Sequence, residues 1–133
     1  MKESKINILD LLLAQDASKI RDLPTAQIRI TRLSDIIGAD FCLEIRALTG
    51  AEIESMPDGM EGIDRKILTA VKNFDFTDTQ LRGKFTPDGR CTPLTPTELI
   101  DVLLLPGEKI QIVRKINDLS GYTDDAVEVI KKN

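Results

Sequence analysis

The sequence contains no histidine and no tryptophan, and aromatic residues make up only 4% of its 133 positions. Histidine is the side chain that most often acts as a general base or binds a metal ion near neutral pH, so both kinds of chemistry lack their usual residue. The two cysteines, Cys42 and Cys91, form no Cys-x-x-Cys motif, and we expect free thiols in a reducing compartment. A disulfide would require their Cα atoms to lie close together, which the sequence leaves open.

Long runs of basic or apolar residues are also missing. The chain has 18 Lys and Arg against 22 Asp and Glu, a formal net charge of -4, and no basic run longer than two residues. Nucleic-acid binding depends on clustered cations, so we expect no nucleic-acid partner. The most apolar stretches, residues 8–14 and 99–105, are far shorter than the ~20 residues of a membrane span, so we expect no membrane partner. The N-terminus lacks the small-residue cleavage site of a signal peptide, so we predict no signal peptide.

The composition that remains is that of an aliphatic globular protein. Apolar residues make up 41% and charged residues 30% of the chain, which is typical of a soluble folded domain. With so few aromatics, the core must consist mainly of Ile, Leu and Val. We predict an N-terminal helix and linker over residues 1–24, followed by a single α+β domain over residues 25–133.

Two segments alternate between apolar and polar residues, which is typical of β-strands. They are residues 27–33 (QIRITRL) and 41–48 (FCLEIRAL), with turn-forming residues at 38–40 between them. We therefore predict an antiparallel hairpin with an irregular loop over residues 34–40. Ile28, Ile30, Leu43 and Ile45 should be buried on one face of this sheet.

The rest of the chain shows helical spacing. We predict a small antiparallel hairpin packed with about five helices and an all-helical C-terminal half. Helices are expected over residues 5–17, from a capping box at 49–52, over 63–74, from a capping box at 95–98 to residue 105, between the Pro106-Gly107 hinge and Gly121, and in a short tail at 123–133. Residues 78–83 indicate a helical turn, and Pro87-Asp88-Gly89 indicates a tight turn.

The segment from Thr95 to Tyr122 is the most informative part of the sequence. Residues 95–98 (TPTE) have the pattern of a capping box, and an unusually apolar helix follows. Pro106-Gly107 then predicts a hinge before an amphipathic helix that ends near Gly121. This succession, with the phrase LLLPGE at its centre, resembles the C-terminal part of the XkdN-like phage tail assembly chaperones.

The resemblance extends, more weakly, over residues 28–122. Residues 44–54 are similar to the family's passage from a strand to a helix, and residues 66–81 are similar to its central helix and the following turn. The chain departs from the family pattern at Phe74, where a proline is common, and in the insertion-like stretch 82–92.

The resemblance implies a non-catalytic chaperone without cofactors. Such a protein would bind the tape measure protein, help to recruit the tail tube protein, act in the host cytoplasm and be absent from the finished virion. The family is often made in two lengths by ribosomal frameshifting. A generic bacterial interaction or adaptor domain is the alternative function, and an enzyme with carboxylate chemistry is a third.

The surplus of apolar side chains suggests a docking surface. We take Ile8, Leu9, Leu12 and Leu13 in the N-terminal helix, with Leu103 and Leu104, as candidate partner-binding residues. The competing interpretation is that these side chains pack on each other and on the hairpin. For Asp75 and Asp78, metal binding competes with simple capping of a turn, which is the more common arrangement. No residue is predicted to be catalytic, to bind a cofactor or to bind a metal.

Overall fold

The computed structural model describes residues 7–131, which contain eight helices and a two-stranded antiparallel sheet. This confirms a small α+β fold with a helical C-terminal half. Three of the helices are only five or six residues long. The first of them is shorter than the predicted helix, and the other two lie where a linker and a helical turn were predicted. The elements are, in order, α1 (Ile8–Leu13), α2 (Ala17–Arg21), β1 (Thr25–Arg29), α3 (Thr31–Ile37), β2 (Cys42–Arg46), α4 (Gly50–Glu54), α5 (Gly59–Ala70), α6 (Thr79–Lys84), α7 (Pro96–Leu103) and α8 (Pro106–Leu119).

The predicted hairpin is present, but its connection is a helix. β1 pairs with β2 in a register that places Ala26 opposite Ile45 and Ile28 opposite Leu43. The first strand stops at Arg29, and residues 31–37 form α3 in place of the end of the predicted strand and the start of the predicted irregular loop. Gly38, with a φ of 74°, ends this helix in the left-handed conformation that glycine adopts readily.

The burial predicted for the sheet holds in part. Leu43 and Ile45 are 1% and 0% exposed, whereas Ile28 is only half-buried. Ile30 is also buried, but it precedes the first residue of α3 and reaches the core from there rather than from the strand. The alternation of Ile28 and Ile30 therefore identified two inward-facing side chains but extended the strand too far.

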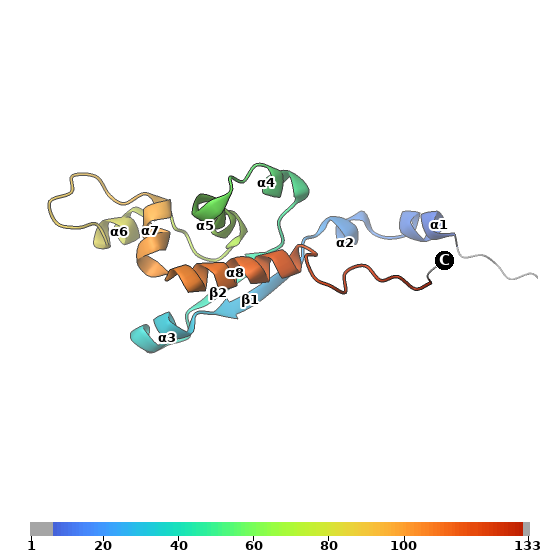
Figure 1. Cartoon of the computed structure of the whole chain (residues 1–133), viewed down its shortest axis with the longest axis horizontal. Coiled ribbons are helices and arrows are strands. Elements are labelled where there is room, and N and C mark those ends of the chain that lie inside the picture. The colour runs from blue at the N-terminus through green and yellow to red at the C-terminus, as the bar shows by residue number, and fades with distance from the viewer. Residues whose placement is uncertain (1–6, 132–133) are drawn as a thin grey trace, which may run out of the picture.

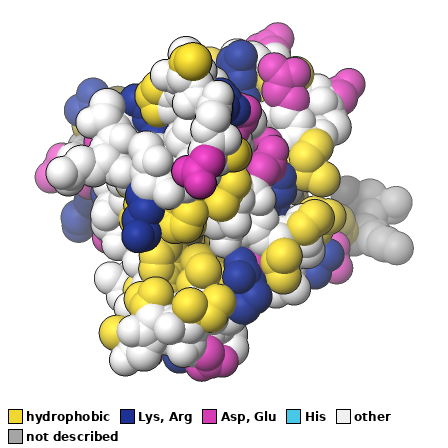
Figure 2. All heavy atoms as spheres, turned by 90° about the vertical axis from the view of Figure 1, so that its left-hand side faces the viewer, with side chains coloured by type: hydrophobic (Ala, Val, Ile, Leu, Met, Phe, Trp, Pro, Cys, Tyr) yellow, Lys and Arg dark blue, Asp and Glu magenta, His cyan; other side chains and the backbone are white. Residues whose placement is uncertain are grey.

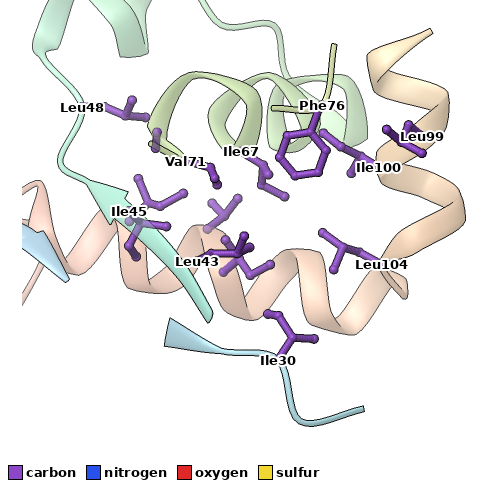
Figure 3. Close-up of a cluster of buried hydrophobic side chains, with 14 residues drawn as sticks. Ile30, Leu43, Ile45, Leu48, Ile67, Val71, Phe76, Leu99, Ile100 and Leu104 are labelled. Carbon is purple, nitrogen blue, oxygen red and sulfur yellow. The ribbon is translucent and has the colours of Figure 1, made fainter. Parts of the chain in front are cut away.

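The core lies between the sheet, α5, α7 and α8. α5 packs against both α7 and α8, and α8 contacts both strands. Figure 3 shows the buried side chains converging from these elements. Burial of each such aliphatic side chain contributes roughly 1.5–3 kcal/mol, so this cluster is the main source of stability. Its members are Ile30, Leu43, Ile45, Leu48, Ile67, Ala70, Val71, Phe76, Leu99, Ile100, Leu104, Ile112, Val113 and Ile116.

The central helix, α5, is displaced from its predicted position. It begins at Gly59 and ends at Ala70, whereas residues 63–74 were predicted. The chain becomes extended at Val71, which forms a β-bridge with Ile45. The N–H of Lys72 then donates to the carbonyl of Glu44 at 2.8 Å. Pairing with the free edge of β2 thus ends the helix earlier than its side-chain spacing suggested.

The capping boxes and the hinge are where the sequence places them. Thr49 and Thr95 cap α4 and α7, each in a reciprocal arrangement with a glutamate three residues later. α7 ends at Leu103, Leu104 is extended, and Pro106 is the first residue of α8, so the predicted break in the helix is confirmed. The predicted turn of residues 78–83 is helix α6, capped by Asp78.

Both ends of the chain differ from the predicted helices. Residues 5 and 6 of the predicted N-terminal helix lie outside the described residues, and the rest contains only the shorter α1. α2 lies in the stretch that was predicted as a linker, and both helices project from the body in Figure 1. The predicted tail helix is wrong: residues 123–131 form turns and irregular backbone. Val127, Val129 and Ile130 in this tail are each at least 74% exposed, so no packing stabilises so short a helix.

Candidate functional site

Helix α1 exposes all of its apolar side chains. It begins at Asn7, whose side-chain oxygen accepts a hydrogen bond from the N–H of Leu9 at 3.0 Å. None of its residues is buried. The exposed fractions are 80% for Ile8, 60% for Leu9, 52% for Leu11, 56% for Leu12 and 73% for Leu13. The four candidates among them occupy one face, because residues 8 and 12, and 9 and 13, lie one turn apart.

Helix α2 continues this exposed N-terminal arm. The carboxylate of Asp16 accepts a hydrogen bond from the N–H of Ser18 at 3.0 Å, which caps the helix and lowers the pKa of Asp16. Ile20 is 63% exposed, and no residue of α2 is buried. Local capping, rather than packing on the body, therefore stabilises both helices. We call the segment that they form, residues 7–21, the α1–α2 arm.

The other two candidate residues have different surroundings. Leu104 is 3% exposed and belongs to the core, so it offers no surface to a partner. Leu103 is half-buried against the same core. The exposed apolar residues near them are Val102 and Leu105, at 51% and 52%. The structure thus does not bring the two candidate groups together into one site.

Polar contacts hold the α7–α8 junction to α3. The guanidinium of Arg32 donates to the carbonyl of Leu103 at 2.7 Å, where α7 ends. The carboxylate of Glu108 accepts from the N–H of Leu105 at 2.7 Å, which satisfies a donor at the start of α8. The hydrogen bond from Arg32 is the main reason why the pKa of Glu108 is lowered.

A buried cation joins α8 to α5 and α7. The ammonium of Lys109 is 3.0 Å from a carboxylate oxygen of Asp64, and both side chains are 4% exposed. It also donates to Asp101, which is half-exposed. Burial lowers the pKa of Lys109, but the hydrogen bonds to Asp101 and Asp64 outweigh it and leave the pKa raised. These groups are fully engaged with each other, so we assign them a structural role.

A hollow of about 530 Å³ lies between β1, the start of α3 and α8. Its walls contain Ile28, Ile30 and Ile112, and charged side chains surround them. The charged residues that line it are Arg29, Arg32, Asp35, Glu108 and Lys115. Arg29 is paired with Asp40 at 2.9 Å and Arg32 with Glu108 at 3.0 Å, so the charges around the hollow balance, with Lys115 and Asp35 as the remaining pair of opposite charges.

A second region of exposed apolar surface lies at the end of the body opposite the α1–α2 arm. Figure 2 shows hydrophobic side chains gathered in a band on this face, with charged groups around it. The elements at this end of Figure 1 are α3, α6 and α7. Their exposed large apolar side chains include Ile36 and Ile37 of α3 and Val102 of α7.

The acidic residues weighed for metal binding act as caps. A carboxylate oxygen of Asp75 accepts from the N–H of Thr77 at 2.8 Å, and Asp78 accepts from the N–H of Leu81 at 2.8 Å. Within residues 7–131, no three His, Cys, Asp or Glu side chains form a group that could hold a metal ion. None of the helices in that part of the chain combines the length and apolar character that a bilayer span requires. Cys42 and Cys91 are free thiols, as expected.

A comparison with protein families identifies the class to which this arrangement belongs. The family described as "Phage XkdN-like tail assembly chaperone protein, TAC" matches residues 58–132, which include α5 to α8. Because the match covers more than half of the chain, the protein belongs to this family of phage tail assembly chaperones. No curated protein and no solved structure is found to match the chain.

Two ion pairs and the hollow beside β1 were not predicted from the sequence. Lys109 and Asp64 are 45 positions apart, and Arg32 and Glu108 are 76 positions apart, so no local pattern connects them. The hollow beside β1 likewise depends on how α8 crosses the sheet. By contrast, the apolar face of α1 follows from residue spacing alone, although its exposure does not.

Proposed function

We propose that this protein is a tail assembly chaperone that binds the tape measure protein through the α1–α2 arm and does so without catalysis. The observation that carries the proposal is the α1 helix, whose five aliphatic side chains are 52–80% exposed and pack on no core. Folded domains rarely leave a group of large aliphatic side chains in water unless a partner covers it. Membership of the chaperone family favours this role over that of a generic adaptor.

The physical basis of the binding is apolar burial. A tape measure protein is long and must stay unaggregated until the tail assembles around it, so its exposed apolar segments need a temporary cover. An amphipathic helix such as α1 provides one by packing its apolar face against theirs. The formal net charge of -4 of each bound copy would keep such a complex dissolved. Covering a surface involves no covalent step and requires no cofactor.

Recruitment of the tail tube protein needs a second surface, and we assign it to the apolar band over α3 and α7. This band lies at the other end of the body from α1, so both partners could be held at once (Figures 1 and 2). Assembly of this kind takes place where the tail proteins are made, so we expect the chaperone to act in the host cytoplasm. A temporary cover leaves as the tube closes, so we expect the protein to be absent from the finished virion.

Co-expression with the tape measure protein from the same locus tests the proposal. The tape measure protein should stay soluble and co-purify with the chaperone. Binding should survive moderate salt and show a negative heat-capacity change, because apolar burial is insensitive to charge screening. Leu9→Asp and Leu12→Asp should abolish co-purification while the circular dichroism spectrum of the body is retained.

The matched control is Ile130→Asp, because Ile130 is 95% exposed and lies in the tail rather than on α1. This variant should bind as well as the wild type. A tape measure protein that remains insoluble with the wild-type chaperone would refute the proposed function. Equal loss of binding in the Ile130 variant would show that α1 is not the specific contact.

A further inference from the structure

The outer edge of β1 is open. The N–H of Ile30 donates to the carbonyl of Phe41 at 3.0 Å, so the even-numbered residues of this segment direct their backbone groups toward β2. The backbone groups of Thr25, Gln27 and Arg29 therefore point away from the sheet, and among residues 7–131 no backbone hydrogen bond outside the β1–β2 pair reaches them. The other edge of the sheet is covered by the segment that follows α5. The unpaired edge of β1 can therefore accept a further strand.

The hollow beside this edge suits apolar side chains. Ile28 faces the same side of the sheet as its partner Leu43, and it lines the hollow together with Ile112 of α8. The charged side chains around the hollow balance, so nothing there favours the burial of a further charge. Its volume of about 530 Å³ lies within the range of pockets that hold ligands. A strand added beside β1 would direct every second side chain over these isoleucines.

The C-terminal tail, residues 123–131, contains a segment of this kind. Val127 and Val129 are 86% and 74% exposed, and Glu128 separates them. In an extended chain the two valines share one face and Glu128 lies on the other. Valine and isoleucine favour strands, and the tail already has turns and irregular backbone in place of a helix. As a strand beside β1, the tail would bury both valines and leave Glu128 in water.

The end of α8 directs the tail away from β1 of its own chain. The hydroxyl oxygen of Ser120 accepts from the N–H of Leu48 at 2.9 Å, which places the end of the helix near the start of β1. Gly121 then turns the chain with a φ of 93°, and the N–H of Tyr122 donates to the carbonyl of Asn117 at 3.0 Å. Figure 1 shows the tail leaving this cap and running away from the sheet. To pair with its own strand, the tail would have to break the cap and reverse its direction, whereas the tail of another molecule has no such restriction.

We propose that the open edge of β1 binds the C-terminal tail of a second copy of this protein, which joins the sheet as a third strand with Val127 and Val129 over the hollow. Each copy carries both halves of the contact, so reciprocal exchange leaves neither a tail nor an edge free and gives a closed pair. The contact involves no residue of the α1–α2 arm and does not rest on the function proposed for that arm.

Sedimentation of the full chain over a concentration series tests the tail. The wild type should shift from monomer to dimer as its concentration rises. The double substitution Val127→Asp and Val129→Asp, called the tail variant, should abolish the dimer because it places two charges over an apolar hollow. The matched control is Glu128→Ala, since Glu128 faces water in the added strand, and it should dimerise within about twofold of the wild type. The tail packs on no core, so these changes leave the body folded.

A second pair of variants tests the edge. Gln27→Pro removes one outward-facing N–H and should raise the dissociation constant about tenfold for each contact. Gln27→Ala is its control, because it keeps the backbone donor and should dimerise within about twofold of the wild type. Circular dichroism checks that both variants keep the fold. A dimer that is insensitive to the tail variant and to Gln27→Pro would overturn the proposal, and so would a wild type that stays monomeric throughout the series.

Mixing two defective chains shows whether the contact lies between molecules. A fluorescein-labelled tail variant keeps an intact edge, and an unlabelled Gln27→Pro chain keeps an intact tail. The anisotropy of the labelled chain should rise when the Gln27→Pro chain is added and should not change when an unlabelled tail variant is added. No rise in either case would overturn the proposal. So would a wild-type monomer whose tail amides exchange slowly with solvent, because the tail would then close on its own β1.

Discussion

Arg32 donates two hydrogen bonds to Glu108, at 3.1 and 3.0 Å, between residues 76 positions apart. The planar guanidinium matches the two carboxylate oxygens, which is the strongest geometry for such a pair. Glu108 lies at the first turn of α8, and Arg32 lies near the start of α3. The pair therefore ties the connection between the two strands to the hinge between the last two helices.

Loss of this pair should loosen the hinge without unfolding the protein. Because the pair is only partly buried, Glu108→Gln should lower the free energy of unfolding by about 1–3 kcal/mol. Urea denaturation measures the effect. The control is Glu61→Gln, since Glu61 is largely exposed and its nearest cation is 4.0 Å away; it should change stability by less than about 0.5 kcal/mol. Equal losses in the two variants would contradict a specific role for the pair.

Acid should reveal the ion pair between Glu52 and Arg46. The hydrogen bond from Arg46 is the main cause that lowers the pKa of Glu52 from 4.5 to about 2. A carboxyl whose pKa is lower in the folded state stabilises the protein above its unfolded pKa, and this contribution is lost as pH falls through the folded pKa. The stability difference between the wild type and Glu52→Gln should therefore shrink from pH 4.5 toward pH 2. A difference that is independent of pH across this window, measured by urea denaturation, would be inconsistent with the lowered pKa.

Gly62 is a position where only glycine fits. A Cβ atom added there would lie 1.8 Å from the carbonyl oxygen of Pro57, so the backbone before α5 would have to move. We expect Gly62→Ala to destabilise the protein by about 1–3 kcal/mol in thermal or urea denaturation. Gly83→Ala is the control, because Gly83 also lies in a helix and nothing lies within 4 Å of its added Cβ. The control should be neutral or slightly stabilising, and a similar loss in both variants would refute the steric explanation.

The buried Lys109 should be costly to remove alone. Lys109→Met leaves Asp64 buried without its cation, and we expect a loss of about 3–5 kcal/mol in the free energy of unfolding. Adding Asp64→Leu should restore much of that loss, because the uncompensated charge is then gone. A double variant no more stable than Lys109→Met would show that the lysine stem, rather than charge pairing, provides the stabilisation.

The features that could be predicted from the sequence are those determined by near neighbours. The capping boxes at Thr49 and Thr95 need only four consecutive residues, and the break at Pro106 needs only the missing N–H of proline. Helix α3 was missed because Ile28 and Ile30 continue the alternation of β1 past the point where the backbone turns. The tail helix failed for the opposite reason, since good capping residues did not compensate for the absence of a packing surface.

The candidate site, like the fold, could be predicted only where it depends on residues close together in the sequence. Spacing identified the apolar face of α1, whereas the assignment of Leu104 to a docking surface could not be tested without knowing which helices pack over it. The hollow beside β1 and the pair of Arg32 with Glu108 arise from the crossing of α8 over the sheet, which no local pattern encodes. These features were not predicted because they depend on contacts between residues far apart in the sequence, whereas the predicted ones depend on near neighbours.

The absence of buried residues in α1 also has an evolutionary consequence. Substitutions there change no core contact, so selection for folding and selection for partner recognition act on different residues of the same chain. In the role proposed for it, α1 can therefore follow sequence drift in its partner without eroding the marginal stability of the body. Related chaperones should accordingly diverge fastest at residues 8–13 and slowest around Ile45, Ile67 and Ile116.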